Sequence, residues 1–228
     1  MVSNTEIALK SKTDITSNFF RNVIKSLGCL SVFCLFISCS SYEQKVAVLK
    51  PNGKSSKDAI IARAYPSQNY SRLEHLHLIS RIKNDSLIDD NRILIYFDLA
   101  DLSLVSKVDS AHIYLYSNGR KDYGQVDFQV LRIVEPWSDE RVTWSKQPKV
   151  DTVDVVTIKS DMSNHKDSIK IDVTSFTDGF FSRDYRNFGF LIRFLEEDQT
   201  GKRLNFYSSD TDKTSKRPEL QIFYHSYF

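Results

Sequence analysis

The 228-residue sequence predicts an all-β fold: a jelly-roll β-sandwich of two antiparallel sheets, with at most one or two short helical turns. Three observations predict it. Short runs in which apolar and polar residues alternate recur from residue 58 onward, which is the period of a half-buried strand. Polar turn segments separate these runs at intervals of about 8–15 residues, as in sandwiches and barrels. One segment alone has the spacing and the end signals of a helix.

The alternating runs give the expected strands in chain order. They are 58–63, 74–80, 92–99, 108–116, 125–134, 168–173, 188–194, 203–209 and 218–226. In the run 92–99 both phases are apolar, so we expect this strand to be buried on both faces. The helical turn is expected to begin at Thr174 and to end near Arg183.

An apolar run, LGCLSVFCLFI at 27–37, follows Arg21 and Lys25. It is shorter than the roughly 20 residues that span a bilayer, and it fits the apolar part of a secretory signal. The run leads into Ser38-Cys39 and resembles the lipobox of bacterial lipoproteins, which predicts cleavage before Cys39 and attachment of lipid to Cys39. A plain signal peptide or a short buried helix is the alternative.

The expected organisation is therefore a signal peptide at 1–38, a lipidated tether at 39–57 and one β-sandwich domain at 58–228. All three cysteines lie within residues 1–39, so the domain is expected to be stabilised by its apolar core without disulfides. Four of the 31 Lys and Arg and two of the 29 Asp and Glu precede residue 39, which leaves 27 of each. This neutral balance argues against nucleic acid as a partner.

Both tryptophans lie in the segment EPWSDERVTWSKQP, at 135–148. Trp137 and Trp144 flank a loop and an expected short strand at 141–144, and the segment ends at Pro148. A sugar-stacking platform and a buried corner of the fold are the two interpretations. We favour the buried corner, because a small core without disulfides needs the large apolar area of Trp.

The order of several motifs resembles one known family. These motifs are DAIIAR (58–63), RILIYFDLADL (92–102), VDSAHIYLY (108–116), VLRIVEPWSDERVTWSKQP (130–148), IDVTSF (171–176), NFGFLIRF (187–194), YSSD (207–210) and RPELQIFY (217–224). Together they resemble the DNRLRE domain family, which includes alginate-binding carbohydrate-binding modules. The resemblance covers about residues 57–224 and implies a secreted jelly-roll sandwich of a kind often appended to polysaccharide-degrading enzymes.

An acidic glycan requires aromatic faces and cations. The expected carbohydrate-binding residues are Tyr70, Tyr116, Arg63, Arg92, Arg132 and Arg193. The planar guanidinium group suits carboxylates. One exposed ion pair gives about 0.2–1 kcal/mol and millimolar binding needs about 4 kcal/mol, so several of these residues must converge on one face. Arginines that pair with acids of the same domain are the alternative for each position.

No catalytic or metal-binding motif stands out. The sequence has no Gly-x-Ser-x-Gly, His-Glu-x-x-His or phosphate loop, so we expect no enzyme activity. His75 and His77 lack a third ligand at a compelling spacing, so no metal site is expected there. Asp58 and the pair Asp89 and Asp90 could hold a structural calcium, and no other cofactor is expected.

These features predict a non-catalytic polysaccharide-binding module of a cell-envelope lipoprotein, on the outer membrane or surface of a Gram-negative bacterium. Its expected partners are an acidic polysaccharide such as alginate and, through the N-terminal lipid, a membrane. One alternative is a structural or adhesive lipoprotein that binds a protein. Another is a polysaccharide lyase, for which Tyr224 with His225, or His112 with Tyr114, could supply the acid and base.

Overall fold

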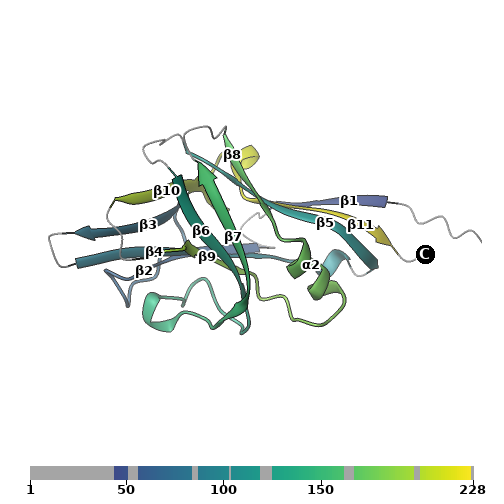
Figure 1. Ribbon diagram of the computed structural model, residues 1–228, viewed down its shortest axis with the longest axis horizontal. Coiled ribbons are helices and arrows are strands. Elements are labelled where there is room, and N and C mark those ends of the chain that lie inside the picture. Colours follow the sequence, from purple (N-terminus) through teal and green to yellow (C-terminus); the bar gives the residue numbers. More distant parts are fainter. Residues whose placement is uncertain are drawn as a thin grey trace, which may run out of the picture. The chain divides into compact units, whose positions relative to one another are not determined.

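A computed structural model describes residues 44–50, 56–83, 87–102, 104–118, 125–161, 167–197 and 201–226 (Figure 1). The predicted lipidation site, Cys39, and the predicted signal peptide lie outside the described residues. No helix among the described residues has the length and apolar character needed to cross a bilayer.

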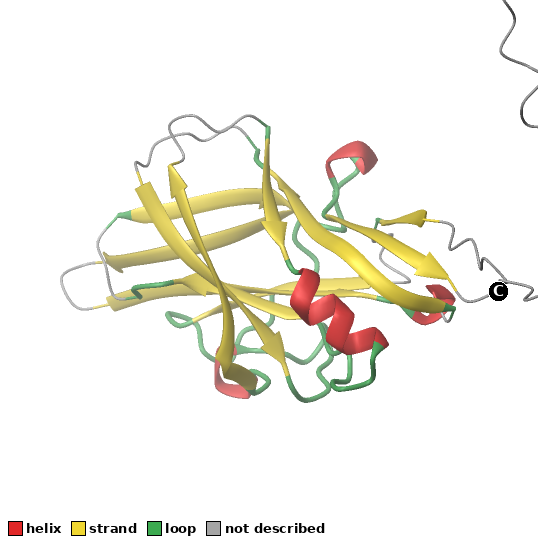
Figure 2. Cartoon of the chain, turned by 45° about the vertical axis from the view of Figure 1, so that its right-hand side comes forward, coloured by secondary structure: helices red, strands yellow, loops and turns green. Residues whose placement is uncertain are grey.

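The described strands form two antiparallel sheets, which confirms the predicted β-sandwich (Figure 2). The four-stranded sheet has the order β1 (Gln44–Leu49), β11 (Glu219–Ser226), β5 (Val105–Tyr116) and β8 (Ser168–Asp172). The seven-stranded sheet has the order β10 (Lys202–Tyr207), β3 (His75–Lys83), β4 (Leu87–Phe97), β9 (Phe190–Phe194), β6 (Gln125–Ile133) and β7 (Val150–Asp161), with β2 (Ser56–Ala62) paired to β4.

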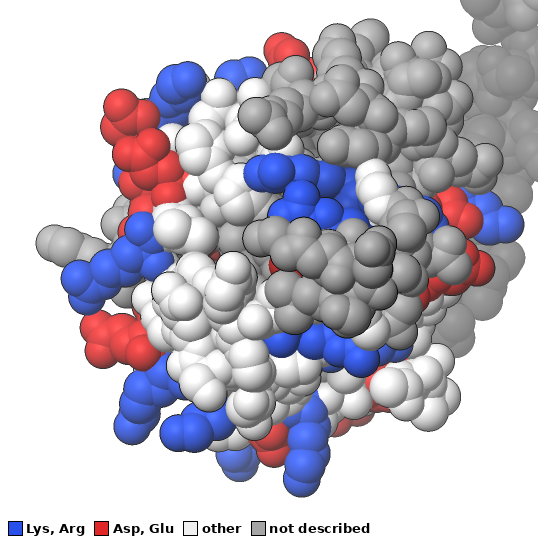
Figure 3. Space-filling model, turned by 90° about the vertical axis from the view of Figure 1, so that its left-hand side faces the viewer, with Lys and Arg blue, Asp and Glu red and all other residues white. Residues whose placement is uncertain are grey.

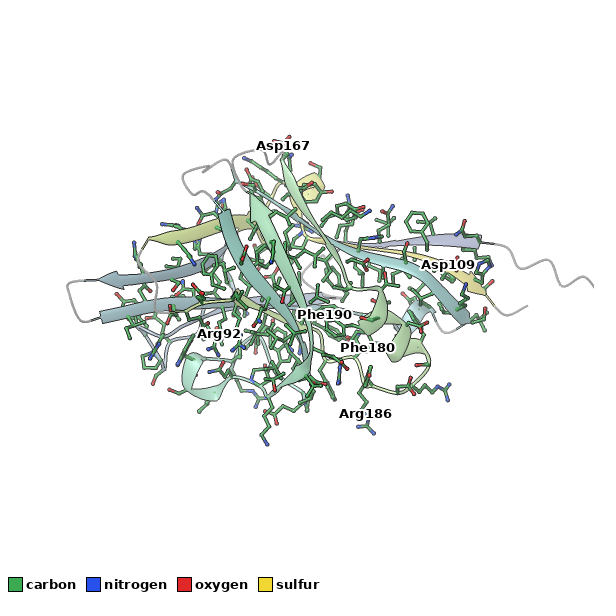
Figure 4. The ribbon with its side chains drawn as sticks, viewed as in Figure 1. Arg92, Asp109, Asp167, Phe180, Arg186 and Phe190 are labelled. Atoms are coloured by element: carbon green, nitrogen blue, oxygen red, sulfur yellow. The ribbon has the colours of Figure 1, made fainter. Side chains whose placement is uncertain are left out.

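Helical structure is short in the residues that the structure describes. Helix α2 (Thr174–Phe181) is the helical segment that the sequence predicts, and its Phe180 ring lies 5.8 Å from the ring of Phe190 in β9 (Figure 4). Three single 3₁₀ turns add to it in the described part of the chain, namely η1 (Ala100–Leu102), η2 (Trp144–Lys146) and η4 (Thr214–Lys216). Short turns are thus more numerous than expected, because one turn is too short to show a helical period in the sequence.

Two strands of the structure were not predicted. Residues 44–49, inside the expected tether, form the edge strand β1, whose Ala47 and Leu49 pack on the core. Strand β7 is the second strand that was not predicted. The register of its pairing with β6 shifts between Leu131 and Ile133, and such an irregularity interrupts the alternation of apolar and polar residues. The expected short strand at 141–144 is wrong, since this stretch leads from a turn into η2.

The main core lies between the sheets. The inner phase of β4 contributes Ile93, Ile95 and Phe97, each at most 1% exposed. The outer phase of the same strand contributes Leu94, which is also fully buried. Strand β4 is therefore buried on both faces, as the sequence predicts.

A second apolar cluster covers the outer face of the seven-stranded sheet. It consists of Ala59, Ile61, Leu94, Leu131, Ile133, Val142 and Leu191. The loop 134–149 covers this cluster, and the half-buried Trp137 and Trp144 pack against it. Trp137 also donates a 2.8 Å hydrogen bond from Nε1 to the carbonyl of Phe188. Both tryptophans thus pack, half-buried, on the outer face of the seven-stranded sheet.

Candidate functional site

The most promising surface lies where the two sheets meet at β5 and β10. An isolated antiparallel bridge joins Ser117, directly after β5, to Phe206 in β10. One position further along, Tyr116 and Tyr207 stand on adjacent strands. Their chain neighbours Leu115 and Phe206 are buried in the core, so alternation turns both tyrosines outward.

The row of rings continues onto the next strand. Tyr207 is paired in register with His75 of β3, and the two ring centroids are 5.3 Å apart. His75 in turn stacks on His77 at 6.3 Å with an interplanar angle of 14°. We call Tyr116, Tyr207, His75 and His77 the aromatic band. It crosses β5, β10 and β3, whose spacing of about 4.8 Å per strand makes it wide enough for a short run of sugar rings.

Cations from one loop lie over the aromatic band. The Lys213 Nζ is 5.2 Å from the Tyr207 ring centroid and 3.3 Å from its hydroxyl oxygen. The Lys216 Nζ, from η4, is 5.6 Å from the Tyr116 ring centroid. Both distances lie within the range of cation–π attraction.

A third cation, Arg203, lies on β10 two positions before Asn205, and its Nε donates a 2.7 Å hydrogen bond to the Asn205 side chain. Asn205 Oδ1 is also 2.7 Å from Nδ1 of His77, which connects Arg203 to the aromatic band. Figure 3, which views the end of the sandwich where β10 begins, shows Lys and Arg side chains both in the middle of that face and along its margins, with most Asp and Glu at the margins.

These cations have little internal compensation. Lys216 is 3.8 Å from Asp167, whose side chain is 91% exposed (Asp167 is labelled in Figure 4). Lys213 and Arg203 take part in no ion pair found among the described residues. An exposed ion pair with a distance as long as that of Lys216 and Asp167 contributes little free energy. All three cations can therefore pair with a ligand with little loss of internal interaction energy.

One acid lies beside the band. Glu219 accepts a 3.4 Å hydrogen bond from the Tyr116 hydroxyl and pairs with Lys50 at 3.0 Å. Burial, together with Glu219, raises the pKa of Tyr116 above its ordinary value. Tyr116 therefore stays neutral and keeps its proton as a hydrogen-bond donor near neutral pH.

A row of aromatic rings with lysines over it is the arrangement expected of a sugar-binding surface. Comparison with known proteins identifies the family. The family model of carbohydrate-binding module family 96 matches residues 52–224. The chain belongs to carbohydrate-binding module family 96. No curated protein matches the chain.

Most arginines predicted to bind the glycan have acidic partners within the family 96 module. Arg63 pairs with the buried Asp90 at 3.0 Å. The guanidinium of Arg92 holds both carboxylate oxygens of Glu197, at 2.7 and 2.5 Å. This guanidinium also stacks on the Trp144 ring at 4.4 Å (Arg92 is labelled in Figure 4).

The other predicted residues also have partners within the module. Arg132 pairs with Asp151 at 2.5 Å and stacks on Tyr185 at 3.8 Å. Arg193 contacts the neutral side chain of Gln129 at 3.3 Å. Tyr70 packs against the main core. The register places Arg92 of β4 opposite Arg193 of β9 on the outer face of the seven-stranded sheet, and Tyr116 is the member that the structure brings to the aromatic band. Pro148, predicted to be structural, is buried near the end of the loop that carries Trp137 and Trp144.

The residues considered for metal binding have other partners. Among the residues that the structure describes, no group of three His, Cys, Asp or Glu side chains is arranged to hold a metal ion. Asp89 pairs with Arg81 at 2.8 Å, and Asp90 pairs with Arg63. Asp58 accepts a 2.7 Å hydrogen bond from the backbone N–H of Ser209.

Asp58 gives the family 96 module a pH-dependent stability. Burial raises its pKa to about 7, and nearby Asp210 and Asp139 act in the same direction, while hydrogen bonds from Ser209 oppose the shift. A folded-state pKa above the unfolded value of 3.8 means that the folded protein holds the proton more tightly. The resulting stabilisation is complete below pH 3.8 and is lost as the pH rises through 7.

We therefore expect Asp58→Asn to be more stable than the wild type at pH 8, with the difference vanishing near pH 4. The pKa difference sets an upper bound of about 4 kcal/mol on the gain. Urea unfolding at a series of pH values measures it. A gain that is the same at every pH would contradict the assignment.

Proposed function

We propose that the family 96 module is a non-catalytic domain that binds an acidic polysaccharide such as alginate along the aromatic band. The observation that supports this most is the position of Lys213 and Lys216 over the rings of Tyr207 and Tyr116. The apolar C–H face of a sugar ring packs on an aromatic ring, and the ammonium groups of Lys213 and Lys216, which lie over the rings without a ligand, move aside to pair with its carboxylate. A neutral polymer offers only the first of these contacts.

The energies are sufficient. Millimolar binding needs about 4 kcal/mol. Two or three ion pairs contribute up to about 1 kcal/mol each, and aromatic contacts add about 0.5–1.5 kcal/mol each beyond the apolar area they bury. Because the rings and Arg203 belong to strands, their arrangement exists before the ligand arrives, which reduces the entropy lost on binding.

Calorimetric titration with alginate tests the proposal, with a neutral glycan of similar length as the reference. We expect alginate affinity to fall with added salt, since Lys213 is exposed and Lys216 and Arg203 are only partly buried. We expect Tyr207→Ala to weaken binding about tenfold or more, which corresponds to about 1.4 kcal/mol. Lys159→Ala, an exposed lysine of β7, is the matched control and should bind as the wild type. Failure of the module to bind any acidic glycan of a broad panel would overturn the proposal.

The cellular setting that we propose follows from the leader. Cleavage before Cys39 and lipidation of Cys39 would attach the module to the outer membrane or surface of a Gram-negative cell. A mature protein with an unmodified Cys39 in mass spectrometry would contradict this part alone.

A protein partner is the second candidate function, and one observation favours it. The edge strand β1 exposes two apolar side chains, Val46 at 50% and Val48 at 49%. A protein that co-purifies with the wild type and is lost with Val46→Lys would support it.

A further inference from the structure

A second concave surface lies within the segment EPWSDERVTWSKQP. The cavity measures about 400 Å³ and is lined by Glu135, Pro136, Trp137, Ser138, Arg141, Val142, Lys146, Gln147 and Pro148. We call it the loop pocket. Its volume is within the range of about 300–1,000 Å³ found for small-molecule sites.

The walls of the loop pocket are fixed by contacts from elsewhere in the fold. Trp137 is held by its hydrogen bond to Phe188 and by packing on the second apolar cluster. Asn69 donates from Nδ2 to the carbonyls of Asp139 and Val142, at 2.6 and 2.7 Å. The Lys57 Nζ lies 4.4 Å from the Trp137 ring centroid and donates to the Trp137 carbonyl. The pocket is therefore formed without a ligand.

The rim of the loop pocket is basic. Arg141 and Lys146 are exposed and take part in no ion pair found among the described residues. The one acid in the lining, Glu135, accepts a 2.9 Å hydrogen bond from the Lys149 backbone and lies 3.9 Å from its ammonium group. The partly exposed edge of Trp137, beside two cations that make no ion pair among the described residues, suits a sugar ring that carries a carboxylate.

We infer that the loop pocket is a second binding site for acidic sugar residues, separate from the aromatic band. The inference rests on the proposed function. In Figures 1 and 2 the aromatic band's loop with η4 is at the top of the module, and the loop with η2 is at the bottom. The views differ by a turn about the vertical axis, so this vertical separation is real. One module therefore binds two glycan strands and cross-links them.

Calorimetry with short alginate oligosaccharides and the full chain tests the inference. We expect two molecules bound per wild-type chain and one per chain of the double variant Arg141→Ala, Lys146→Ala. The site that remains should keep its affinity and its dependence on Tyr207. Lys159→Ala changes an exposed cation of β7 that does not line the pocket, so it should still bind two. Because all three side chains are exposed, the variants should fold as the wild type.

Two further readouts separate the sites. In Trp144→Phe, Trp137 is the one remaining tryptophan, and its emission should change as the loop pocket fills. With long alginate, the wild type should raise turbidity, while Tyr207→Ala and the double pocket variant should not.

The outcomes distinguish this inference from the proposed function. One site per chain, lost in Tyr207→Ala and unchanged in the double pocket variant, would overturn the loop pocket alone. One site lost in the pocket variant and kept in Tyr207→Ala would support the loop pocket and overturn the aromatic band. No binding to the wild type would overturn both.

Discussion

Gly189→Ala is expected to lower the free energy of unfolding by roughly 3–5 kcal/mol, among the largest effects of a single substitution. Gly189 has φ +87°, a conformation that L side chains rarely adopt. A Cβ at this position would lie 2.3 Å from the Ile95 carbonyl oxygen and 3.0 Å from the Tyr96 Cα. Both are backbone atoms of the central strand β4, so neither can move without disturbing the core.

Urea unfolding followed by tryptophan fluorescence measures this loss. Gly201→Ala is the matched control, because Gly201 has φ +91° and a Cβ there would meet nothing within 4 Å. The control isolates the cost of the backbone conformation, about 1 kcal/mol. Equal losses in the two variants would show that the collision with β4 has no energetic weight.

Trp137→Ala is expected to cost about 2–4 kcal/mol of unfolding free energy. The change removes a large apolar side chain from the second cluster, and it leaves the Phe188 carbonyl without its indole donor. The full range for buried Trp is not expected, because Trp137 is half-buried. The loss of the ring also removes the cation–π partner of Lys57.

Thermal and urea unfolding monitored by circular dichroism give the size of this effect. Trp137→Phe, which keeps an aromatic ring but loses the donor, should fall between the wild type and Trp137→Ala. Unfolding curves of Trp137→Ala that overlay the wild type would contradict the role of the segment in closing the outer face of the seven-stranded sheet.

Periodicity predicted most of the fold because burial of one face imposes alternation on each strand. The run 92–99 is an example. One of its apolar phases packs in the main core, and the other packs in the second apolar cluster. Strand β1 gave no such signal. Its short apolar stretch becomes a strand only beside β11, and the pairing partner lies more than 170 positions away in the chain.

The candidate site was harder to predict, because its residues come together through pairing between distant strands. Tyr116, Tyr207 and His75 are neighbours only once β10 lies between β5 and β3. Two signals were present in the sequence, His75-x-His77 and the outward phase Arg203, Asn205 and Tyr207 of β10, and either could have been used.

The arginines illustrate the opposite difficulty. Alternation predicts the face of the sheet on which a strand arginine lies. It does not predict which acidic residue of another element pairs with that arginine. Glu197 lies 105 positions from Arg92, and Asp151 lies 19 positions from Arg132. Such pairs, partly buried and hydrogen-bonded, hold strands and loops together and leave the guanidinium unavailable to a ligand.

The most direct test of the acidic-glycan site is an NMR titration of isotope-labelled protein with alginate oligosaccharides. We predict that the backbone signals of Tyr116, His75, Tyr207 and Lys213 shift together along one saturation curve. Saturating oligosaccharide that leaves these four signals in place would contradict the account.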